Sequence, residues 1–217
     1  MAWSKTEFRE QYTKLANIYD PGMWLYRGIG LRIERYRRIA VDALLLKPGD
    51  TVVDLGCGTG LNFSYLQDAV GEQGRIIGVD LTPAMLDQAR DRATKVGWEN
   101  IELVEADMSG YQFSGEANGV ISTLALATVP DYEDVVARAA RQLPAGAAIA
   151  EFDLQWPENW PTWLAHLGVW LNRPAGVTPD IVQRRPADAI KQHFDAVETR
   201  DVYFGAGVIC SGIVTRS

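Results

Sequence analysis

Apolar runs alternate with amphipathic stretches along this chain, and that alternation predicts most of its fold. Five runs rich in apolar residues have the length and composition of buried strands: 51–55, 75–79, 101–106, 119–124 and 147–154. Between them, apolar positions recur at helical spacing over 60–69, 83–95 and 132–143. Strands that alternate with helices in this way predict an α/β fold with a doubly wound, mostly parallel sheet.

The end of the chain departs from that alternation. A predicted helix at 186–194 precedes two predicted strands, 196–204 and 208–215, which are joined by the short turn 205–207. Two strands joined by so short a turn must be antiparallel. We therefore predict a seven-stranded sheet that is mostly parallel and has an antiparallel last strand.

The N-terminal part is predicted to be helical over 4–18 and 29–46, with a Tyr-Asp-Pro-Gly turn at 19–22. The second helix carries a cluster of arginines: Arg32, Arg35, Arg37 and Arg38, with Arg27 just before it. One interpretation is a solvated face that pairs in part with nearby acids, and the other is a patch for an anionic headgroup or membrane surface. We favour the solvated face because the chain as a whole is acidic.

The most informative stretch is 51–63, TVVDLGCGTGLNF, in which a strand runs into a glycine-rich turn and then a helix. Asp54 lies at the end of the strand, and three glycines follow at alternate positions, Gly56, Gly58 and Gly60. Glycine is required where the backbone takes positive φ or where a ligand lies against it. A dinucleotide-binding loop would place its third glycine one residue later, and a phosphate-binding P-loop would contain a lysine. Neither pattern fits, and an ordinary tight turn is one alternative that stays open.

Ligand-binding groups recur at the ends of the next strands. Asp80 ends the second strand, Asp107 and Met108 end the third, and Thr123 lies at the end of the fourth. In an open α/β sheet these ends all face one crevice, where ligands bind. An acid at the end of the second strand is placed to bind ribose hydroxyls.

The D-x-G-x-G-x-G pattern from Asp54 to Gly60 resembles motif I of the class I S-adenosylmethionine (SAM) methyltransferases, and the resemblance covers roughly 47–154. It implies a Rossmann-like fold and SAM as cofactor, with S-adenosylhomocysteine (SAH) as product. The cofactor-binding residues that it implies are Tyr19, Asp54, Gly56, Gly58, Gly60, Asp80, Leu81, Met85, Asp107, Met108 and Thr123.

The resemblance also implies what these residues do. Asp54 orients the glycine turn and helps to hold the methionyl amino group. The carboxylate of Asp107 accepts the adenine amino group, beside the main-chain N–H of Met108. Leu81 and Met85 flank the adenine, although packing in the core is the alternative for Met85.

A Tyr-Asp pair ahead of motif I, at Tyr19 and Asp20, resembles the quinone-biosynthesis-like methyltransferases, in which the N-terminal segment closes over the cofactor. By that resemblance Tyr19, and with it Tyr12, reaches the methionyl end of SAM. The alternative is that both are half-buried packing residues with hydroxyls in water.

Residues 155–185 bear on the substrate, because they hold few charges and four tryptophans: Trp156, Trp160, Trp163 and Trp170. One interpretation, which we favour, is a helix packed on the sheet edge with its tryptophans in the core. The other is an apolar cap over the acceptor, for which a membrane contact is left open because Trp is favoured there. His166 lies off the apolar stripe and is the candidate for proton handling on the substrate side, with a surface histidine as the alternative. The loop 124–130 offers no histidine as a base.

Composition narrows the function further. The chain has 217 residues, of which 47% are apolar, and this length and composition suit one α/β domain. A net charge of −7 argues against nucleic acid as a partner. Two isolated histidines and two isolated cysteines do not make a metal site. The N-terminus lacks the apolar core of a secretory signal, so we expect a cytoplasmic protein, with a peripheral membrane contact left open.

We therefore predict a SAM-dependent methyltransferase that acts on a small or lipid-like acceptor, either an amine, a phenol or a quinone. The single domain 1–217 divides into an N-terminal helical cap (1–46), a cofactor-binding core (47–154), a substrate cap (155–185) and a C-terminal helix and β-hairpin (186–217). Two alternatives remain, a non-catalytic SAM-binding subunit and an NAD(P)-dependent oxidoreductase. The sequence leaves the oligomeric state open.

Overall fold

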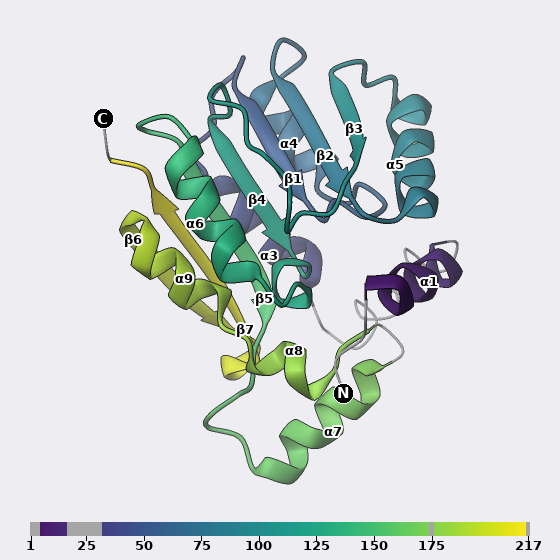
Figure 1. The fold of residues 1–217 in the computed structure, drawn as a ribbon, viewed down its shortest axis with the longest axis vertical. Coiled ribbons are helices and arrows are strands. Elements are labelled where there is room, and N and C mark those ends of the chain that lie inside the picture. Colours follow the sequence, from purple (N-terminus) through teal and green to yellow (C-terminus); the bar gives the residue numbers. More distant parts are fainter. Residues whose placement is uncertain (1–4, 17–31, 174–175, 216–217) are drawn as a thin grey trace.

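The computed structural model describes residues 5–16, 32–173 and 176–215, and its centre is a seven-stranded sheet (Figure 1). The strands are β1 (Thr51–Leu55), β2 (Arg75–Asp80), β3 (Ile101–Glu105), β4 (Gly119–Thr123), β5 (Ala148–Leu154), β6 (Asp195–Val202) and β7 (Gly207–Ile213). Their order is β3-β2-β1-β4-β5-β7-β6, in which β7 is antiparallel to both of its neighbours. The predicted seven-stranded, mostly parallel sheet is confirmed.

All described helices except α8 lie where the periodicity predicts them, with shifted ends; α8 was not predicted. They are α1 (Lys5–Leu15), α3 (Ile33–Asp42), α4 (Phe63–Val70), α5 (Pro83–Val96), α6 (Tyr132–Gln142), α7 (Thr162–Asn172), α8 (Pro179–Gln183) and α9 (Pro186–His193), with 3-10 turns η1 (Leu126–Thr128) and η3 (Tyr203–Gly205). The strand predicted to reach 204 ends at Val202 instead, because Tyr203 and Phe204 take positive φ of 51° and 55°.

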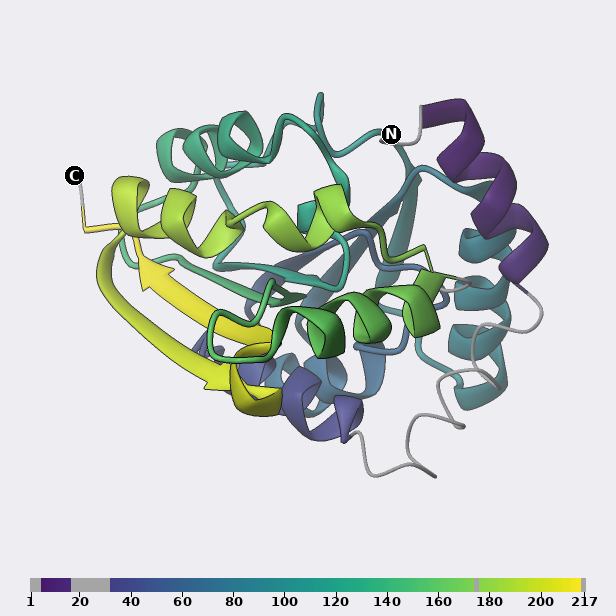
Figure 2. The same cartoon turned by 90° about the horizontal axis from the view of Figure 1, so that it is seen from below.

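The molecule has three layers, which Figure 2 shows edge-on. One face of the sheet buries apolar side chains against α6 and α9, and the other buries them against α3, α4 and α5. Alternate residues of one strand serve the two faces: Ile149 of β5 packs with α6 and α9, while Ala150 and Phe152 pack on the opposite side. Burial on both faces explains why β1, β2 and β4 are near-continuous apolar runs, whereas β3 at the edge of the sheet contains two glutamates and no buried residue.

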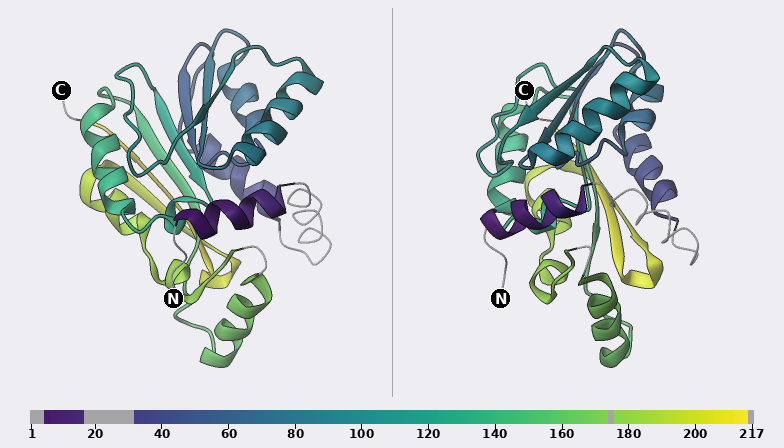
Figure 3. Two further views of the ribbon diagram at one scale, coloured as in Figure 1. Left: turned by 45° about the vertical axis from the view of Figure 1, so that its right-hand side comes forward. Right: turned by 90° about the vertical axis from the view of Figure 1, so that its right-hand side faces the viewer.

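Helix α1 lies at the end of the sheet where the parallel strands finish (Figure 3). Arg9 of α1 forms an ion pair of 3.0 Å with Glu105, the last residue of β3. This contact joins the N-terminal helix to the edge that carries the predicted ligand-binding groups.

Helix α7 projects from the body of the molecule (Figures 1 and 3), and its tryptophans are not in a core. Trp163 is 68% exposed and Trp170 is 66% exposed. The prediction that we favoured, a helix with its tryptophans in the core, is wrong for these two residues. It is Ala165 that is buried on this helix. Among the described residues, no helix combines the length and apolar character that crossing a bilayer requires.

A buried acid on β5 gives a prediction about stability. Glu151 is fully buried, and its carboxyl oxygens have no hydrogen-bond partner among the described residues. Burial, with Asp153 and Asp188 nearby, raises the pKa of Glu151 well above its ordinary value, against the opposing effect of Lys191. The carboxyl group of Glu151 therefore stays protonated in the folded protein at pH values where it is ionised in the unfolded chain.

We expect Glu151→Gln to be more stable than the wild type at pH 8, and the difference to shrink toward pH 5. A raised folded-state pKa gives stability that is fully present below the unfolded pKa of about 4.3 and lost as pH rises, by up to about 1.4 kcal/mol per pH unit. Denaturant unfolding of both proteins at several pH values measures the difference. A difference that stays constant with pH would contradict the protonated state of Glu151.

Candidate functional site

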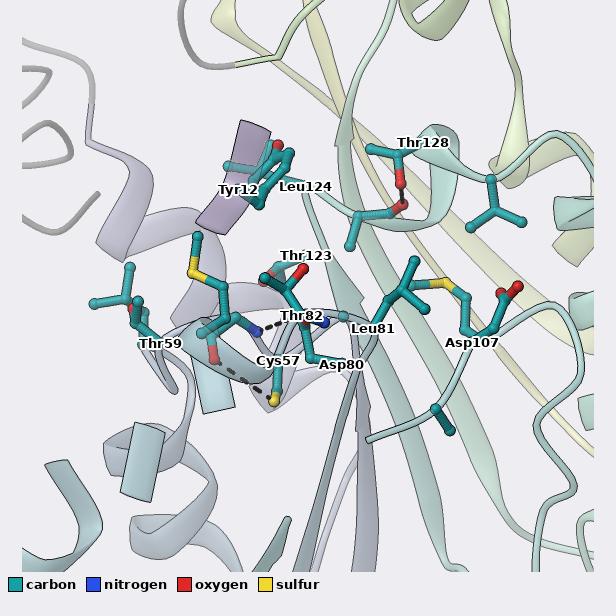
Figure 4. Close-up of a pocket in the computed structure, with 18 of the residues that line it drawn as sticks. Tyr12, Cys57, Thr59, Asp80, Leu81, Thr82, Asp107, Thr123, Leu124 and Thr128 are labelled. Atoms are coloured by element: carbon teal, nitrogen blue, oxygen red, sulfur yellow. Dashed lines mark hydrogen bonds between the residues drawn. The ribbon is translucent and has the colours of Figure 1, made fainter. Parts of the chain in front are cut away.

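The ends of β1, β2, β3 and β4 surround a cavity of about 290 Å³, which we call the strand-end cavity (Figure 4). Its walls include eight of the eleven residues that the sequence predicts to bind the cofactor: Gly56, Gly58, Asp80, Leu81, Met85, Asp107, Met108 and Thr123. Residues far apart in the chain converge there because parallel strands end at one edge of the sheet.

The glycine turn requires glycine for two different reasons. Gly56, Gly58 and Gly60 all take positive φ, at 70°, 54° and 76°. A Cβ on Gly56 would lie 2.4 Å from the Cβ of Ala125, and one on Gly60 would lie 2.6 Å from the ring of Phe63. A Cβ on Gly58 would have no atom within 4 Å. Gly56 and Gly60 therefore permit close packing against Ala125 and Phe63, while the space beside Gly58 is open.

Asp80 joins the turn to the second strand. Its Oδ2 accepts a hydrogen bond of 2.9 Å from the main-chain N–H of Gly58, and its Oδ1 accepts one of 2.8 Å from that of Thr82. Burial raises the pKa of Asp80, and these hydrogen bonds act in the opposite direction. A carboxylate has lone pairs for further donors, so Asp80 remains able to accept from a ligand's hydroxyl groups.

Asp107 and Met85 lie on other walls of the same cavity. Asp107 caps its own turn, since its Oδ1 accepts a hydrogen bond of 2.8 Å from the N–H of Ser109. Met85 is 1% exposed and belongs to the buried part of α5, so it lines the cavity and packs in the core at once.

Asp54 lies behind the glycine turn and not on the cavity wall. It is fully buried, and the amide nitrogen of Asn62 donates to both of its oxygens, at 3.0 and 3.1 Å. Burial raises the pKa of Asp54 to about 7, although the hydrogen bonds from Asn62 and the charge of Arg37 oppose the rise. Asn62 also donates to Thr123, so the network reaches the cavity wall.

Arg37 points inward, which corrects the prediction that the arginines of this helix form one solvated face. Arg32, Arg35 and Arg38 are exposed, whereas Arg37 is 5% exposed and lines the strand-end cavity. Its Nη1 donates to Asn62 Oδ1 at 2.9 Å and to the hydroxyl of Thr123. Its Nε is buried with no hydrogen-bond partner among the described residues.

A second cavity of about 220 Å³, which we call the α7 cavity, adjoins the first. Its walls come from α7, α8, η3 and the end of β5, and most of them are apolar: Ile33, Leu124, Phe152, Leu154, Pro157, Trp160, Ala165, Val169, Val177, Ile181 and Val182. Tyr12, Leu124 and Thr128 line both cavities. We call these three shared residues the boundary between the cavities, because ligands bound in the two cavities would meet there.

Leu124 reaches that boundary through an unusual backbone conformation. It follows β4 with φ of 58°, which is uncommon for a leucine, and its N–H donates to the carbonyl of Phe152 at 2.7 Å. Figure 4 draws Leu124 among the residues that line the strand-end cavity, which also include Tyr12 of α1. Backbone strain of this kind is found at ligand-binding sites.

The remaining predicted site residues lie elsewhere. His166 is exposed and lines neither cavity, and its ring packs edge-on against Trp156 at 5.1 Å between centroids. Gly60 lines neither cavity, and Tyr19 falls outside the described residues. Within 5–16, 32–173 and 176–215, no three His, Cys, Asp or Glu side chains are grouped to hold a metal ion.

Arg37, Asn62 and Asp153 are among the polar residues of the site that the sequence did not predict. Arg37 carried a usable signal, because Ala40, Val41 and Leu44 follow it at helical spacing and are all buried. Asn62 stands between two apolar residues and gave no such signal, whereas Asp153 lies near the end of the fifth predicted strand, where ligand-binding groups are expected.

The sequence of this chain is similar to those of known methyltransferases. Residues 52–146 match a family model described as a methyltransferase domain. The chain is 31% identical to a 2-phytyl-1,4-naphtoquinone methyltransferase of Synechococcus elongatus over 67% of this chain and 63% of that protein. It is 29% identical to the aklanonic acid methyltransferase DauC of a Streptomyces species, over 67% and 64%. The chain thus spans less than two thirds of the length of these curated relatives.

Solved structures share the fold at lower identity. A geranyl diphosphate C-methyltransferase from Streptomyces coelicolor, solved with Mg²⁺, geranyl diphosphate and SAH, superposes with a TM-score of 0.68 at 19% identity, covering 83% of this chain and 79% of that one. A putative methyltransferase in complex with the Trm112 activator of Haloferax volcanii gives a TM-score of 0.72 at 18% identity, covering 94% and 98%.

Proposed function

Residues 52–146 belong to the class I SAM-dependent methyltransferases, and on that premise we propose that this protein transfers the methyl group of SAM to a small apolar acceptor. The observation that carries the proposal is the pair of adjoining cavities, one with polar groups suited to a nucleoside and one with mostly apolar walls. Tyr12, Leu124 and Thr128 border both, so two ligands would meet there.

The strand-end cavity fits the chemistry of SAM. Asp80 offers carboxylate oxygens to the two ribose hydroxyls, and Asp107 offers an acceptor to the adenine amino group. Leu81 and Met85 supply apolar surface on either side of the adenine ring. The open space beside Gly58 lets the cofactor lie close to the main chain.

The methionyl end carries a carboxylate, and Arg37 supplies a buried cation at that cavity. Its unpartnered Nε is a donor that an anionic ligand would satisfy. We propose that Asp54, which lies behind the wall, acts through Asn62 to hold the glycine turn and Thr123 in place. Tyr12 covers the boundary with the α7 cavity.

SAM supplies an electrophilic methyl group that is bound to a sulfonium sulfur. The leaving group is the thioether of SAH. The chain's part is to hold the acceptor in line with that methyl group and to exclude water. Correct orientation of two reactants accounts for about 7–11 kcal/mol of a reaction barrier. The short boundary between the cavities provides this orientation, since Leu124 is fixed by its hydrogen bond to β5.

Residues 155–185 form the substrate cap in this proposal, because α7 and α8 wall the apolar cavity. Apolar walls favour an apolar or amphipathic acceptor. Two of the relatives are named for a naphthoquinone and for aklanonic acid, which supports a ring-containing acceptor of the quinol class for this chain.

The test is to fill the α7 cavity while leaving the strand-end cavity unchanged. Val169 lines the α7 cavity, and Leu171 lies on the same helix but is 59% exposed. With dihydroxynaphthalene as acceptor, we expect Val169→Trp to lower SAH formation from SAM at least tenfold and Leu171→Trp to leave it unchanged. Calorimetry should show the same SAH affinity in both variants. Equal turnover in the two variants, or no turnover in the wild type, would contradict the proposed acceptor site.

A further inference from the structure

A carboxyl group borders the α7 cavity close to the boundary with the strand-end cavity. Asp153, near the end of β5, is 3% exposed and lines the α7 cavity. The residue before it, Phe152, is aligned with Thr123 of β4, and Leu124 comes next on that strand's path. Thr123 lines the strand-end cavity and Leu124 lines both. Asp153 thus lies one strand away from the boundary.

The carboxyl group of Asp153 is held by the 3-10 turn η1, which lies at this boundary. Its Oδ2 accepts a hydrogen bond of 3.0 Å from the main-chain N–H of Ala127, in η1. The last residue of η1, Thr128, lines both cavities. A carboxylate has about four lone-pair sites, so one held in this way still has capacity for a ligand's proton.

This inference rests on the proposed function: we propose that Asp153 is the catalytic base, and that the acceptor is a phenol or enol whose hydroxyl oxygen receives the methyl group. The acceptor oxygen forms a bond to the methyl carbon as the carbon–sulfur bond breaks, and the electron pair of that bond stays on sulfur. The proton of the hydroxyl passes to the Asp153 carboxylate and from there to solvent. The positive charge of the sulfonium and the negative charge of the carboxylate are both removed in the step.

The surroundings of Asp153 suit a base that works near neutral pH. Burial raises the pKa of Asp153 to about 7, while its main-chain hydrogen bonds and the charge of Arg37 act to lower it. Glu151 lies two residues away on β5, and its own raised pKa keeps it protonated and uncharged. Arg184 binds the carbonyls of η1, and the Tyr203 hydroxyl is buried beside the same cavity. A base is most effective when its pKa lies near the working pH.

The first test compares two probes: one carries a hydroxyl group that can donate its proton, and the other carries a methoxy group in its place. In the wild type saturated with SAH at pH 8, calorimetry should show naphthol binding at least tenfold more tightly than methoxynaphthalene. Protonation of Asp153 at pH 5.5 should reduce that preference to below threefold. Asp153→Asn should show less than threefold preference at both pH values, whereas Glu151→Gln should behave as the wild type does.

Infrared difference spectra supply a readout that requires no turnover and no ligand. The wild type minus Asp153→Asn should contain a protonated carboxylic acid band that disappears as pH rises through about 7. With naphthol and SAM, Asp153→Asn should lower kcat at least a hundredfold and leave the KM for SAM within threefold.

Three results would overturn the assignment of Asp153. They are a naphthol preference that survives in Asp153→Asn, no naphthol preference in the wild type, and tighter binding of cationic naphthylmethylamine than of naphthol. The wild-type comparisons decide the matter even if the variant does not fold. SAH binding without any naphthol preference would remove this inference alone, whereas loss of SAH binding in the wild type would remove the proposed function.

Discussion

Gly56→Ala should destabilise the protein by about 2–5 kcal/mol and abolish cofactor binding. The left-handed backbone costs an alanine about 1–2 kcal/mol, and overpacking costs about 1–3 kcal/mol more. The overpacking arises because the new Cβ would lie 2.4 Å from the Cβ of Ala125 and 3.0 Å from the Cε of Met108. Both neighbours line the strand-end cavity, so relief of the clash would distort the cavity wall.

Gly58→Ala is the matched control. It shares the positive φ, but its Cβ meets no atom within 4 Å, so it should lose only the backbone contribution of about 1–2 kcal/mol. Denaturant unfolding measures both losses. Because Gly58 lines the cavity, its variant should bind SAH more weakly while remaining folded. Equal destabilisation by the two substitutions would contradict the close packing of Gly56 against Ala125 and Met108.

Arg37→Met should cost about 3–5 kcal/mol of stability, because it removes a buried cation whose charge stabilises the ionised form of Asp54, together with its hydrogen bonds to Asn62 and Thr123. Arg37 lowers the pKa of Asp54 and holds Asn62, which in turn binds Asp54. Without it the pKa of Asp54 should rise further, so the loss should be greater at pH 8 than at pH 5.5. Stability from a raised pKa is present at low pH and lost as pH rises.

Two further variants separate this explanation from a general effect of losing an arginine. Arg38→Met lies on the same helix but breaks an exposed ion pair with Asp68, and it should cost at most about 1 kcal/mol. Asp54→Asn in the Arg37→Met background should recover at least half of the loss, because the uncompensated carboxylate is removed. Urea unfolding of the four proteins provides the comparison. If Asp54→Asn recovers nothing, the stability does not depend on this charge pair.

Much of the fold follows from the sequence because its signals are local and repeated. Most of the parallel strands are apolar runs that end in, or are followed at once by, a polar or glycine residue, and the sheet brings those ends together. The antiparallel hairpin follows from the short turn alone. For the same reason most of the predicted cofactor-binding residues line one cavity. Their positions in the sequence do not tell how far apart they lie in space.

The parts that could not be predicted depend on which way a helix or strand faces. Helix α7 has no charged residue, so apolar periodicity cannot tell its inner face from the outer one that carries Trp163 and Trp170. Arg37 lies in a run of arginines whose other members are exposed. Asp153 belongs to an apolar strand, and only the packing of α7 and α8 places a cavity beside it.

The central claim is that the strand-end cavity binds SAM through Asp80, and calorimetric titration with SAH tests it most directly. We expect the wild type to bind SAH in the micromolar range and Asp80→Ala to bind it at least tenfold more weakly. Asp87→Ala removes an exposed acid of α5 that pairs with Arg90, and it should bind as the wild type does. Absence of SAH binding by the wild type, or equal affinity in the Asp80 and Asp87 variants, would contradict the account.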